Sequence, residues 1–510
     1  YTLAQNNVQG GLNAMIIVTG HGRYNHLLLT ACSIIANAVA LDLFGFSIIV
    51  AAANCDLKLG VTETGVLASA PFAGVIFAYP WGYYADTRGR RRALLVSTIT
   101  GFVFAALGSF SPSWQIMMFF KIVACSFSNA SYTLTMTILG ECTGPSHRSK
   151  YLFIMNSINL VAECFSFSLA YFLLPLQFIW PIPFLGINYR PWRLFTLALA
   201  LPMGIGGLMI AYLHESPKFL ASRGDNKKAL EVLRSIHEWN GGRKNEYKVS
   251  DMIISVPIIS FWESVVRQTV PIFKPPLLWK TLQLFYLMAI CCSTNNAFVM
   301  WYPTIVNIFF KSFSGGWNNE KTFCTRVFGG NATAMTHGIA ESTGVSIHAT
   351  GMYFTSVVWS KAHSFFQYVC NDTISSNTIY AGILYGLFFF TVTLLVSKVA
   401  SRRRLVLISW LLISGLSGAL VDLYQPAASL AFFVLLQSSA VGVPSLAAYC
   451  VDLYPTAYRG MVTSLGMMVA RLCSLAGVNL VGAVITTNCS LTFYIWSVFS
   501  RRRIVLFSKT

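Results

Sequence analysis

Four ionisable residues lie inside long apolar stretches of this chain, namely Asp42, Lys121, Glu163 and Arg471. If these stretches cross a membrane, a charge at the bilayer centre costs at least about 2.5–3.5 kcal/mol, so each residue needs a partner or a function. A buried carboxylate can exchange a proton or pair with a cation. A static ion pair, or a position near the membrane surface, would account for the same residues without any function. We treat all four as candidates for a solute or ion pathway.

Polar and aromatic residues accompany them on the apolar stretch 281–310. Asn295, Asn296, Trp301 and Tyr302 place amides and amphipathic rings where apolar side chains would suffice. Aromatic faces suit organic cations, so these residues could line the same pathway. Trp301 and Tyr302 could equally belong to an aromatic belt at the membrane surface.

The composition indicates which elements must position these residues. Of the 510 residues, 55% are hydrophobic and 11% are charged, and the mean hydropathy is +0.60, whereas soluble proteins carry about 25% charge. Twelve apolar stretches approach or exceed the roughly 20 residues that cross a bilayer as a helix. They are 27–53, 65–84, 93–111, 115–140, 151–175, 193–213, 281–310, 379–398, 404–421, 427–451, 460–485 and a weaker one near 491–507. The sequence predicts an all-α, multi-pass membrane protein.

The net charge of +18 could suggest nucleic-acid binding. Lys and Arg, however, concentrate in alternate loops, as the positive-inside rule expects, so we exclude a nucleic-acid partner. The loop 214–280 carries eleven basic residues and is expected in the cytoplasm together with the N-terminal segment 1–26. Within this loop, Asp225 could cap an amphipathic surface helix that Gly241 and Gly242 end.

A second polar insert, 311–378, should lie outside the cell or in a vesicle lumen. It contains glycosylation acceptor sequences at Asn331 and Asn371, and a third acceptor at Asn488 falls in the last outer loop. Cys324 and Cys370 share this oxidising side, so a disulfide between them is plausible. The cysteines show no metal-ligand spacing, and we expect no metal, no cofactor and no enzymatic site.

The sequence also contains an internal repeat. Glu141 and Arg148 recur 311 residues later as Asp452 and Arg459, and the same offset places Arg91 on Arg402. Two homologous halves of six spans follow, with a first half at 27–213 and a second half at 281–310 and 379–510. Parallel halves of this kind enclose a substrate site near the membrane midplane.

The loop between the second and third spans reads Gly82-Tyr-Tyr-Ala-Asp86-Thr-Arg88-Gly89-Arg90-Arg91-Arg92. It resembles the signature G-x-L-A-D-R-x-G-R-R of the major facilitator superfamily, which implies the twelve-helix major facilitator fold in two pseudo-symmetric halves and a cytoplasmic latch between helices. Glu215-Ser-Pro217 and Asp452-Leu-Tyr-Pro455 are similar to further motifs of sugar and organic-ion transporters in that superfamily. The residues that this resemblance assigns to the latch are Gly82, Asp86, Arg88, Gly89, Arg90, Arg91, Glu141, Arg148, Glu215, Asp452 and Arg459.

Within the superfamily, the chain is most similar to the synaptic vesicle glycoprotein 2 family and to organic-ion transporters, on the basis of Gly20-His-Gly22-Arg23-Tyr24 and Asp42. This resemblance places Tyr171 where an aromatic residue contributes to a ligand site. Val443 and Ala447 stand where that family has a tryptophan and an acidic residue, so its drug-binding site is not expected here.

The resemblance implies transport of a small organic solute, such as an organic ion, by alternating access, with coupling to a proton or another cation or driven by the solute gradient alone. The expected partners are the lipid bilayer and the solute, and the expected location is the plasma membrane or a secretory or synaptic-type vesicle membrane. The alternative is a vesicle glycoprotein that acts through protein partners. Ser397, which stands where the first half has Asp86, and the weak last span favour that alternative.

Overall fold

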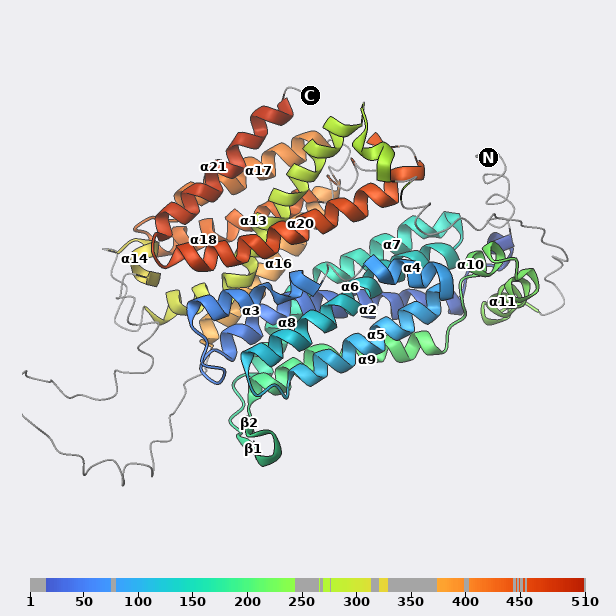
Figure 1. Cartoon of the computed structure of the whole chain (residues 1–510), viewed down its shortest axis with the longest axis horizontal. Coiled ribbons are helices and arrows are strands. Elements are labelled where there is room, and N and C mark those ends of the chain that lie inside the picture. Colours follow the sequence, from blue (N-terminus) through green and yellow to red (C-terminus); the bar gives the residue numbers. More distant parts are fainter. Residues whose placement is uncertain are drawn as a thin grey trace, which may run out of the picture.

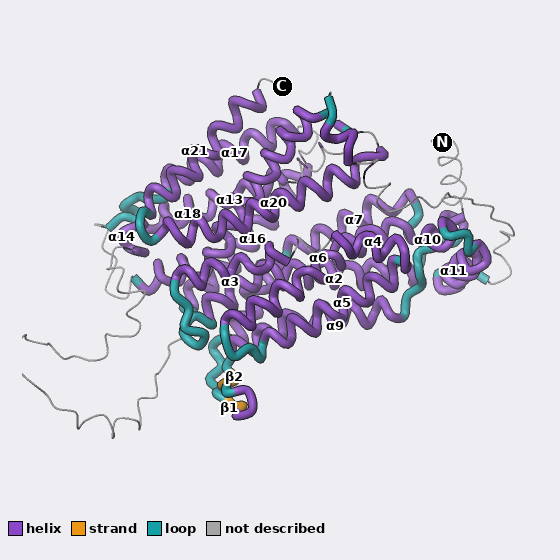
Figure 2. Tube along the Cα trace, in the orientation of Figure 1, coloured by secondary structure: helices purple, strands orange, loops and turns teal. Residues whose placement is uncertain are grey.

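The computed structural model describes residues 15–74, 79–243, 269–275, 277–312, 321–328, 374–398, 403–443 and 456–508, with a few isolated residues between these ranges. Nearly all of the described chain is helical, and Figure 2 shows one small pair of strands at one end of the bundle. The helices run side by side in two groups, with the first half of the chain in blue to green and the second half in yellow to red (Figure 1).

The first half contains eight helices. They are α2 (Arg23–Ala52), α3 (Val61–Gly74), α4 (Tyr79–Arg88), α5 (Arg90–Gly108), α6 (Trp114–Cys142), α7 (Pro145–Leu160), α8 (Ala162–Leu173) and α9 (Pro191–Ala211). Val161 separates α7 from α8, so the predicted fifth span consists of two helices. The predicted second span contains α3 and α4, and residues 75–78 between them lie outside the described ranges. Two shorter helices follow, α10 (Pro217–Ser222) and α11 (Asn226–Trp239).

The second half begins with the 3₁₀ turn η3 (Val270–Phe273). It continues with α13 (Leu278–Lys311), α14 (Phe323–Phe328), α16 (Ser376–Lys398), α17 (Arg403–Leu420), α18 (Pro426–Leu436), η5 (Gln437–Gly442), α20 (Thr456–Ile485) and α21 (Cys489–Ser508). The predicted tenth span thus turns from α-helix to 3₁₀-helix at Gln437, whose side-chain amide donates to the Phe433 carbonyl four residues before it. Eight helices in the described ranges are long and apolar enough to cross a membrane. The apolar part of α21, Cys489–Val498, is shorter, as the sequence predicted.

We call the end of the bundle with α10 and α11 the inner end, because the charge pattern assigns it to the cytoplasm. The opposite end carries α14 and the strands β1 (Trp180–Ile182) and β2 (Ile187–Tyr189), which pair antiparallel, and we call it the outer end (Figure 1). The β1–β2 hairpin in the loop after the fifth span was not predicted.

The apolar core joins the two halves at the outer end and separates them at the inner end. One cluster of buried residues, from Ala40 to Trp496, combines side chains of α2, α3 and α8 with those of α13, α18 and α20. Trp301 of α13 packs there so closely against Gly65 and Gly482 that a Cβ at Gly482 would lie 2.7 Å from the indole ring. Towards the inner end, one cluster draws only on residues 24–236 and another only on residues 272–470. Among the described residues, the halves therefore share a buried apolar cluster at the outer end only.

The amphipathic helix of the inner loop is confirmed as α11. Its residues Ala229, Leu233 and Ile236 are buried, and the chain ends it at Gly241, whose φ is +101°. Asp225 is the N-cap residue, as predicted, but its carboxylate makes no capping hydrogen bond and instead contacts Lys228 at 3.3 Å on the surface. Since Ala229 and Leu233 pack against Ile16 and Ala221, the helix lies on the protein.

The expected disulfide between Cys324 and Cys370 is also wrong, because Cys324 pairs with Cys489 at the start of α21. These two residues are 165 positions apart, and their sequence context gives no signal for the pairing. The Asp422 carboxylate reinforces the junction by accepting hydrogen bonds from the Cys324 backbone N–H at 2.9 Å and from the Ser490 hydroxyl at 2.5 Å. Asn488 is exposed at the outer end, whereas the acceptors at Asn331 and Asn371 lie outside the described residues.

Candidate functional site

Asp42 and Lys121 form a buried ion pair inside the first half. The Lys121 ammonium lies 2.5 Å from Asp42 Oδ1 and also donates to the Asp42 backbone carbonyl at 2.5 Å. Asp42 Oδ2 accepts from the Cys125 thiol at 3.3 Å and from the Ser128 hydroxyl at 3.5 Å. The Lys121 ammonium also lies 4.4 Å from the centre of the Phe46 ring. The static ion pair that sequence reasoning kept as an alternative is therefore present.

A small cavity adjoins this pair. Its walls come from α2, α5, α6 and α9, all of the first half, and include Phe104, Met117 and Thr196. Neither Asp42 nor Lys121 contacts Arg471. The structure therefore does not bring these predicted pathway residues together in one site. The pair is thus positioned to hold α2 and α6 to each other.

Glu163 lines a second, small cavity, which lies between the two halves. Phe44, Ser47 and Ile48 of α2 and Ser166 and Phe167 of α8 form one wall, and Val299 and Tyr302 of α13 and Tyr385 of α16 form the other. Within the described part of the chain, the Glu163 carboxylate has no ion-pair or hydrogen-bond partner. Of the predicted pathway residues, Glu163 and Tyr302 are therefore brought together, and Tyr385 is an addition that sequence reasoning missed.

Trp301 and Tyr302 are buried in the core, each about 2% exposed, which argues against an aromatic belt at the membrane surface. The Trp301 indole N–H donates to the Val478 carbonyl at 3.1 Å, and the Tyr302 hydroxyl donates to the Ala381 carbonyl at 3.2 Å. Both residues thus tie α13 to neighbouring helices of its own half.

Asn295 and Asn296 are not part of either cavity. The Asn296 amide donates to the Ser474 hydroxyl at 2.9 Å, and the Asn295 amide donates to Asn296 Oδ1 at 3.2 Å. This chain of hydrogen bonds links α13 to α20, which is a structural contribution.

Arg471 and Tyr171 both reach across the junction between the halves. The Arg471 guanidinium on α20 lies 5.8 Å from the centre of the Phe72 ring on α3, and no carboxylate within the described ranges pairs with it. Tyr171 on α8 is 39% exposed, and its hydroxyl accepts from that of Tyr380 on α16 at 3.4 Å.

The predicted latch assembles at the inner end of the first half. Glu215 Oε1 accepts from the Arg91 backbone N–H at 2.8 Å, while the Arg91 guanidinium donates to the carbonyls of Ile210 and Ala211 at the end of α9. Glu141 Oε2 lies 3.4 Å from Arg90 Nε and also accepts from the Ser216 hydroxyl. The start of α5, the end of α6 and the segment after α9 are thus joined by charges.

Gly89 is required in this latch for two reasons. Its φ of +111° and ψ of +146° form a conformation that residues with a Cβ rarely adopt. A Cβ at this position would also lie 2.4 Å from Glu215 Oε2. The signature glycine therefore lets the Glu215 carboxylate reach the α5 backbone.

The other latch residues are less closely engaged. Arg148 donates to the Thr143 carbonyl at 3.5 Å, and Arg88 is exposed. Burial lowers the pKa of nearby Lys218, the charge of Arg148 lowers it further, and Glu141 opposes both effects. Asp452 and the side chains of Asp86 and Arg459 lie outside the described residues, as does Gly82 apart from its place in α4.

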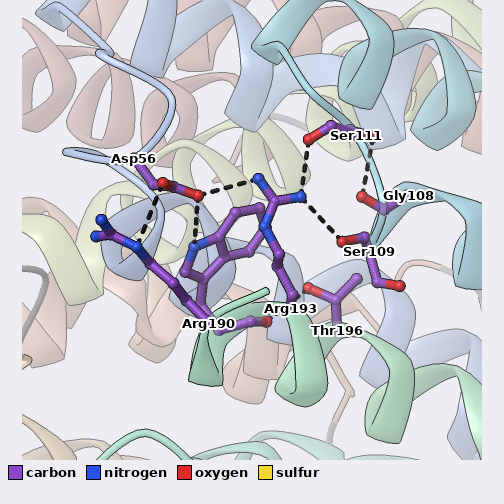
Figure 3. A network of polar contacts seen from close by, with 8 residues as sticks. Asp56, Gly108, Ser109, Ser111, Arg190, Arg193 and Thr196 are labelled. Carbon is purple, nitrogen blue, oxygen red and sulfur yellow. Dashed lines mark hydrogen bonds and ion pairs between the residues drawn. The ribbon is translucent and has the colours of Figure 1, made fainter. Parts of the chain in front are cut away.

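A polar network at the outer end was not predicted from the sequence (Figure 3). Asp56, in the loop after α2, lies 3.0 Å from Arg193 Nη2 and 3.5 Å from Arg190 Nε, and it accepts from the Trp192 indole at 3.2 Å. Arg193 is 2% exposed and also donates to the carbonyls of Ser109 and Ser111. Arg190 and Arg193 lie on the outer side, contrary to the positive-inside rule. This departure is the signal in the sequence that could have indicated an acidic partner for them.

Histidines form a second unpredicted cluster, at the inner end. The His21 ring stacks on His147 at 4.1 Å between centroids and meets His26 edge-on at 5.1 Å. The Tyr151 hydroxyl lies 3.0 Å from His21 Nε2. Burial lowers the pKa of His21, and His147, His26 and Lys150 lower it further by charge repulsion. The cluster connects the segment before α2 to the start of α7.

Within the described residues, no group of three or more His, Cys, Asp or Glu side chains could hold a metal ion. The site is instead a set of separate polar features in a helical frame, comprising the Asp42–Lys121 pair, the Glu163 cavity between the halves and the latch.

Comparison with known proteins relates this arrangement to a family. The profile of the Major Facilitator Superfamily matches residues 30–318. Curated relatives include human synaptic vesicle glycoprotein 2B, 24% identical over 43% of this chain, and human synaptic vesicle glycoprotein 2A, 25% identical over 44%. The matches cover only 32% and 31% of those proteins, so the chain aligns with about a third of their length.

Solved structures with the same fold extend the match to the whole chain. The xylose transporter XylE from E. coli, in a partially occluded inward-open conformation, covers 96% of this chain and aligns over 99% of its own, with a TM-score of 0.63. A D-xylose-proton symporter covers 95% of this chain and 97% of its own, with a TM-score of 0.64. Both are 12% identical to this chain, so they establish the fold alone.

Proposed function

This chain belongs to the major facilitator superfamily, and we propose that it is a secondary transporter that moves a small organic solute across a membrane by alternating access. It is an integral, multi-pass membrane protein with the two-half fold of that superfamily. In this architecture the two halves rock about a site near the midplane and open it to each side in turn.

The distribution of the core between the halves is the observation that supports this proposal most directly. The halves share apolar contacts at the outer end, where α3 packs on α20 and α8 on α16, whereas their inner ends have separate cores. Such an arrangement suits a state open to the cytoplasm. Gly65 and Gly482 have no side chain, which allows the two halves to pack closely at the outer end. The halves must separate there when the protein opens outward.

The latch supports the same function. Charged contacts through Glu141 and Glu215 hold the inner ends of α5, α6 and α9 as one unit, so that the first half can move as a rigid body. Rigid-body motion of this kind is how packed helices switch between two discrete arrangements. The name of a structural neighbour, a D-xylose-proton symporter, makes a coupled proton one candidate driving force.

The test is counterflow in liposomes that contain the purified protein. A panel of sugars, organic cations and organic anions is loaded inside, and exchange of each labelled solute is measured by mass spectrometry at two external pH values. We expect selective exchange of one class, reduced by the double substitution Asp42→Asn, Arg471→Gln and unchanged by Glu231→Gln on the exposed face of α11. Absence of exchange for every solute would overturn the proposal and favour a membrane glycoprotein that acts through partners.

A further inference from the structure

The cavity around Glu163 has a chemical character that the transporter fold by itself does not specify. It lies between the two halves. Besides the carboxylate, its polar lining consists of four hydroxyl groups, those of Ser47, Ser166, Tyr302 and Tyr385. The direction of the hydrogen bonds made by these hydroxyls determines what a bound molecule would meet.

All four hydroxyls donate away from the cavity. The acceptors are the Phe44 carbonyl for Ser47 at 2.7 Å, the Ala162 carbonyl for Ser166 at 2.9 Å, the Ala381 carbonyl for Tyr302 at 3.2 Å and Gln437 Oε1 for Tyr385 at 3.0 Å. The orientation of the Gln437 amide is fixed because its nitrogen donates to the Phe433 carbonyl at 3.2 Å. Since a carbonyl only accepts, each hydroxyl uses its single proton in a hydrogen bond outside the cavity. It therefore presents only lone pairs to a molecule inside the cavity.

Glu163 therefore lies in a lining of acceptors and aromatic rings. No donor or cation in the described part of the chain contacts its carboxylate. A carboxylate that loses water without gaining a partner is costly, and either a proton or a cation removes that cost. A positively charged group supplies the counter-charge that the described part of the chain does not.

The rings around the carboxylate favour an organic cation. Tyr302 lies 6.1 Å from Phe167 and 4.7 Å from Tyr385 between ring centroids, and all three residues line the cavity. Aromatic faces attract ammonium groups, most strongly where water is excluded.

We propose that this cavity binds the ammonium group of a small organic amine, with Glu163 as its counter-charge and Phe167, Tyr302 and Tyr385 as its aromatic walls. The inference rests on the proposed transport function insofar as the amine is the solute carried. Because Glu163 and Phe167 belong to the first half and Tyr302 and Tyr385 to the second, a bound cation would contact both halves. Binding of the cation would therefore stabilise the state in which the two halves are in contact around this cavity.

The first experiment measures binding separately from transport. Protein in lipid nanodiscs is titrated with choline, with ethanolamine, with the neutral choline isostere 3,3-dimethyl-1-butanol and with acetate, and the thermal midpoint is followed, because a ligand that binds only the folded state raises it. The variants are Glu163→Gln, which keeps the shape of the side chain, Glu163→Asp, which keeps its charge, and the exposed control Glu231→Gln.

We expect an amine to stabilise the wild type and the control equally, and the isostere and acetate to have no effect. Removing one partner of a desolvated charge pair should weaken amine binding about thirty-fold or more in Glu163→Gln, with a smaller loss in Glu163→Asp. Equal amine binding by Glu163→Gln and the wild type would overturn the proposal, as would equal binding of choline and its isostere. An unchanged midpoint of the ligand-free Glu163→Gln variant shows that the variant is folded.

Counterflow with the same variants separates this inference from the transport function. Amine binding that depends on Glu163, without exchange of any solute, would leave the cation site standing and remove the transport function. Exchange of a neutral or anionic solute that is unaltered in Glu163→Gln would leave transport standing and remove the cation site as the substrate site. A third outcome is that no amine binds and that exchange in Glu163→Gln loses only its pH dependence. That result would show that the carboxylate carries a proton, and it would overturn the amine proposal.

Discussion

The buried pair of Asp42 and Lys121 allows a quantitative test of whether an ionisable residue in this membrane protein is structural or mechanistic. The perturbation is a cycle of three variants, Asp42→Asn, Lys121→Met and the two combined. Each single substitution leaves one buried group without its opposite charge, which lies 2.5 Å away in the wild type. The combined variant removes both charges.

The expected magnitudes follow from the contacts of each group. Removing one partner of a buried ion pair costs about 3–5 kcal/mol. In Asp42→Asn, Lys121 keeps its bond to the backbone carbonyl and its place over the Phe46 ring, contacts that offset about 1–2 kcal/mol. We therefore expect Asp42→Asn to lower the free energy of unfolding by about 2–4 kcal/mol. In Lys121→Met, Asp42 keeps only the longer contacts with Cys125 and Ser128, and we expect about 3–5 kcal/mol.

The combined variant should be more stable than either single variant and within about 1 kcal/mol of the wild type, because exchanging a whole buried pair for uncharged groups is often nearly neutral. The assay is reversible unfolding by SDS in mixed micelles, with counterflow measured on the same preparations. Full counterflow by the combined variant would mark the pair as structural, whereas stability restored without counterflow, or without its pH dependence, would mark it as part of the mechanism. The reasoning fails if Asp42→Asn changes stability by less than about 0.5 kcal/mol, or if the two substitutions are simply additive.

Three further predictions concern the two ends of the bundle. Gly89→Ala should lower the free energy of unfolding by about 1–3 kcal/mol and reduce counterflow, because the new Cβ would be strained and would meet Glu215; unchanged SDS unfolding would count against this account of the latch. Cys489→Ser should expose a free Cys324 thiol to maleimide labelling of the folded protein and lower the free energy of unfolding by about 2–5 kcal/mol, and continued protection of that thiol would show that it has another partner. Because burial and neighbouring histidines lower the pKa of His21 from its ordinary value of 6.5, the folded protein takes up a proton less readily than the unfolded chain, so its stability should fall as the pH drops below about 6.5. His21→Gln should flatten that dependence in thermal midpoints measured between pH 7.5 and pH 5.5, and an equally steep profile in the variant would assign the effect elsewhere.

The spans and the latch could be predicted because both depend on patterns along the chain. Apolar stretches of about 20 residues must be helical in a bilayer, since a spanning segment has to satisfy its backbone polar groups internally. The latch residues Gly89, Arg90 and Arg91 are consecutive, and their partner Glu215 begins a second motif, two residues before Pro217. The helix breaks at Val161 and Gln437 were not predictable, because they depend on local backbone geometry inside otherwise continuous apolar stretches.

The partners of the pathway residues could not be predicted for a different reason. Sequence reasoning identified Asp42, Lys121 and Glu163 as equivalent candidates, since each is simply an ionisable residue in an apolar stretch. The structure separates them, because Lys121 reaches Asp42 across 79 positions whereas Glu163 has no such partner in the described chain. The same holds for Asp56, whose contact with Arg193 spans 137 positions.

The sequence by itself determined that this chain is a two-half helical membrane protein with a charged latch at its inner end, because hydropathy, charge and short motifs act locally. Only the tertiary structure decided which buried charge is neutralised and which faces a cavity. Side-chain pairing between helices depends on how each helix is rotated and how deep it lies, and these are set by packing over the whole bundle. The hydroxyl protons of Tyr302 and Tyr385 are likewise directed to acceptors on neighbouring helices, which leaves only their lone pairs for the Glu163 cavity, as the proposed cation site requires.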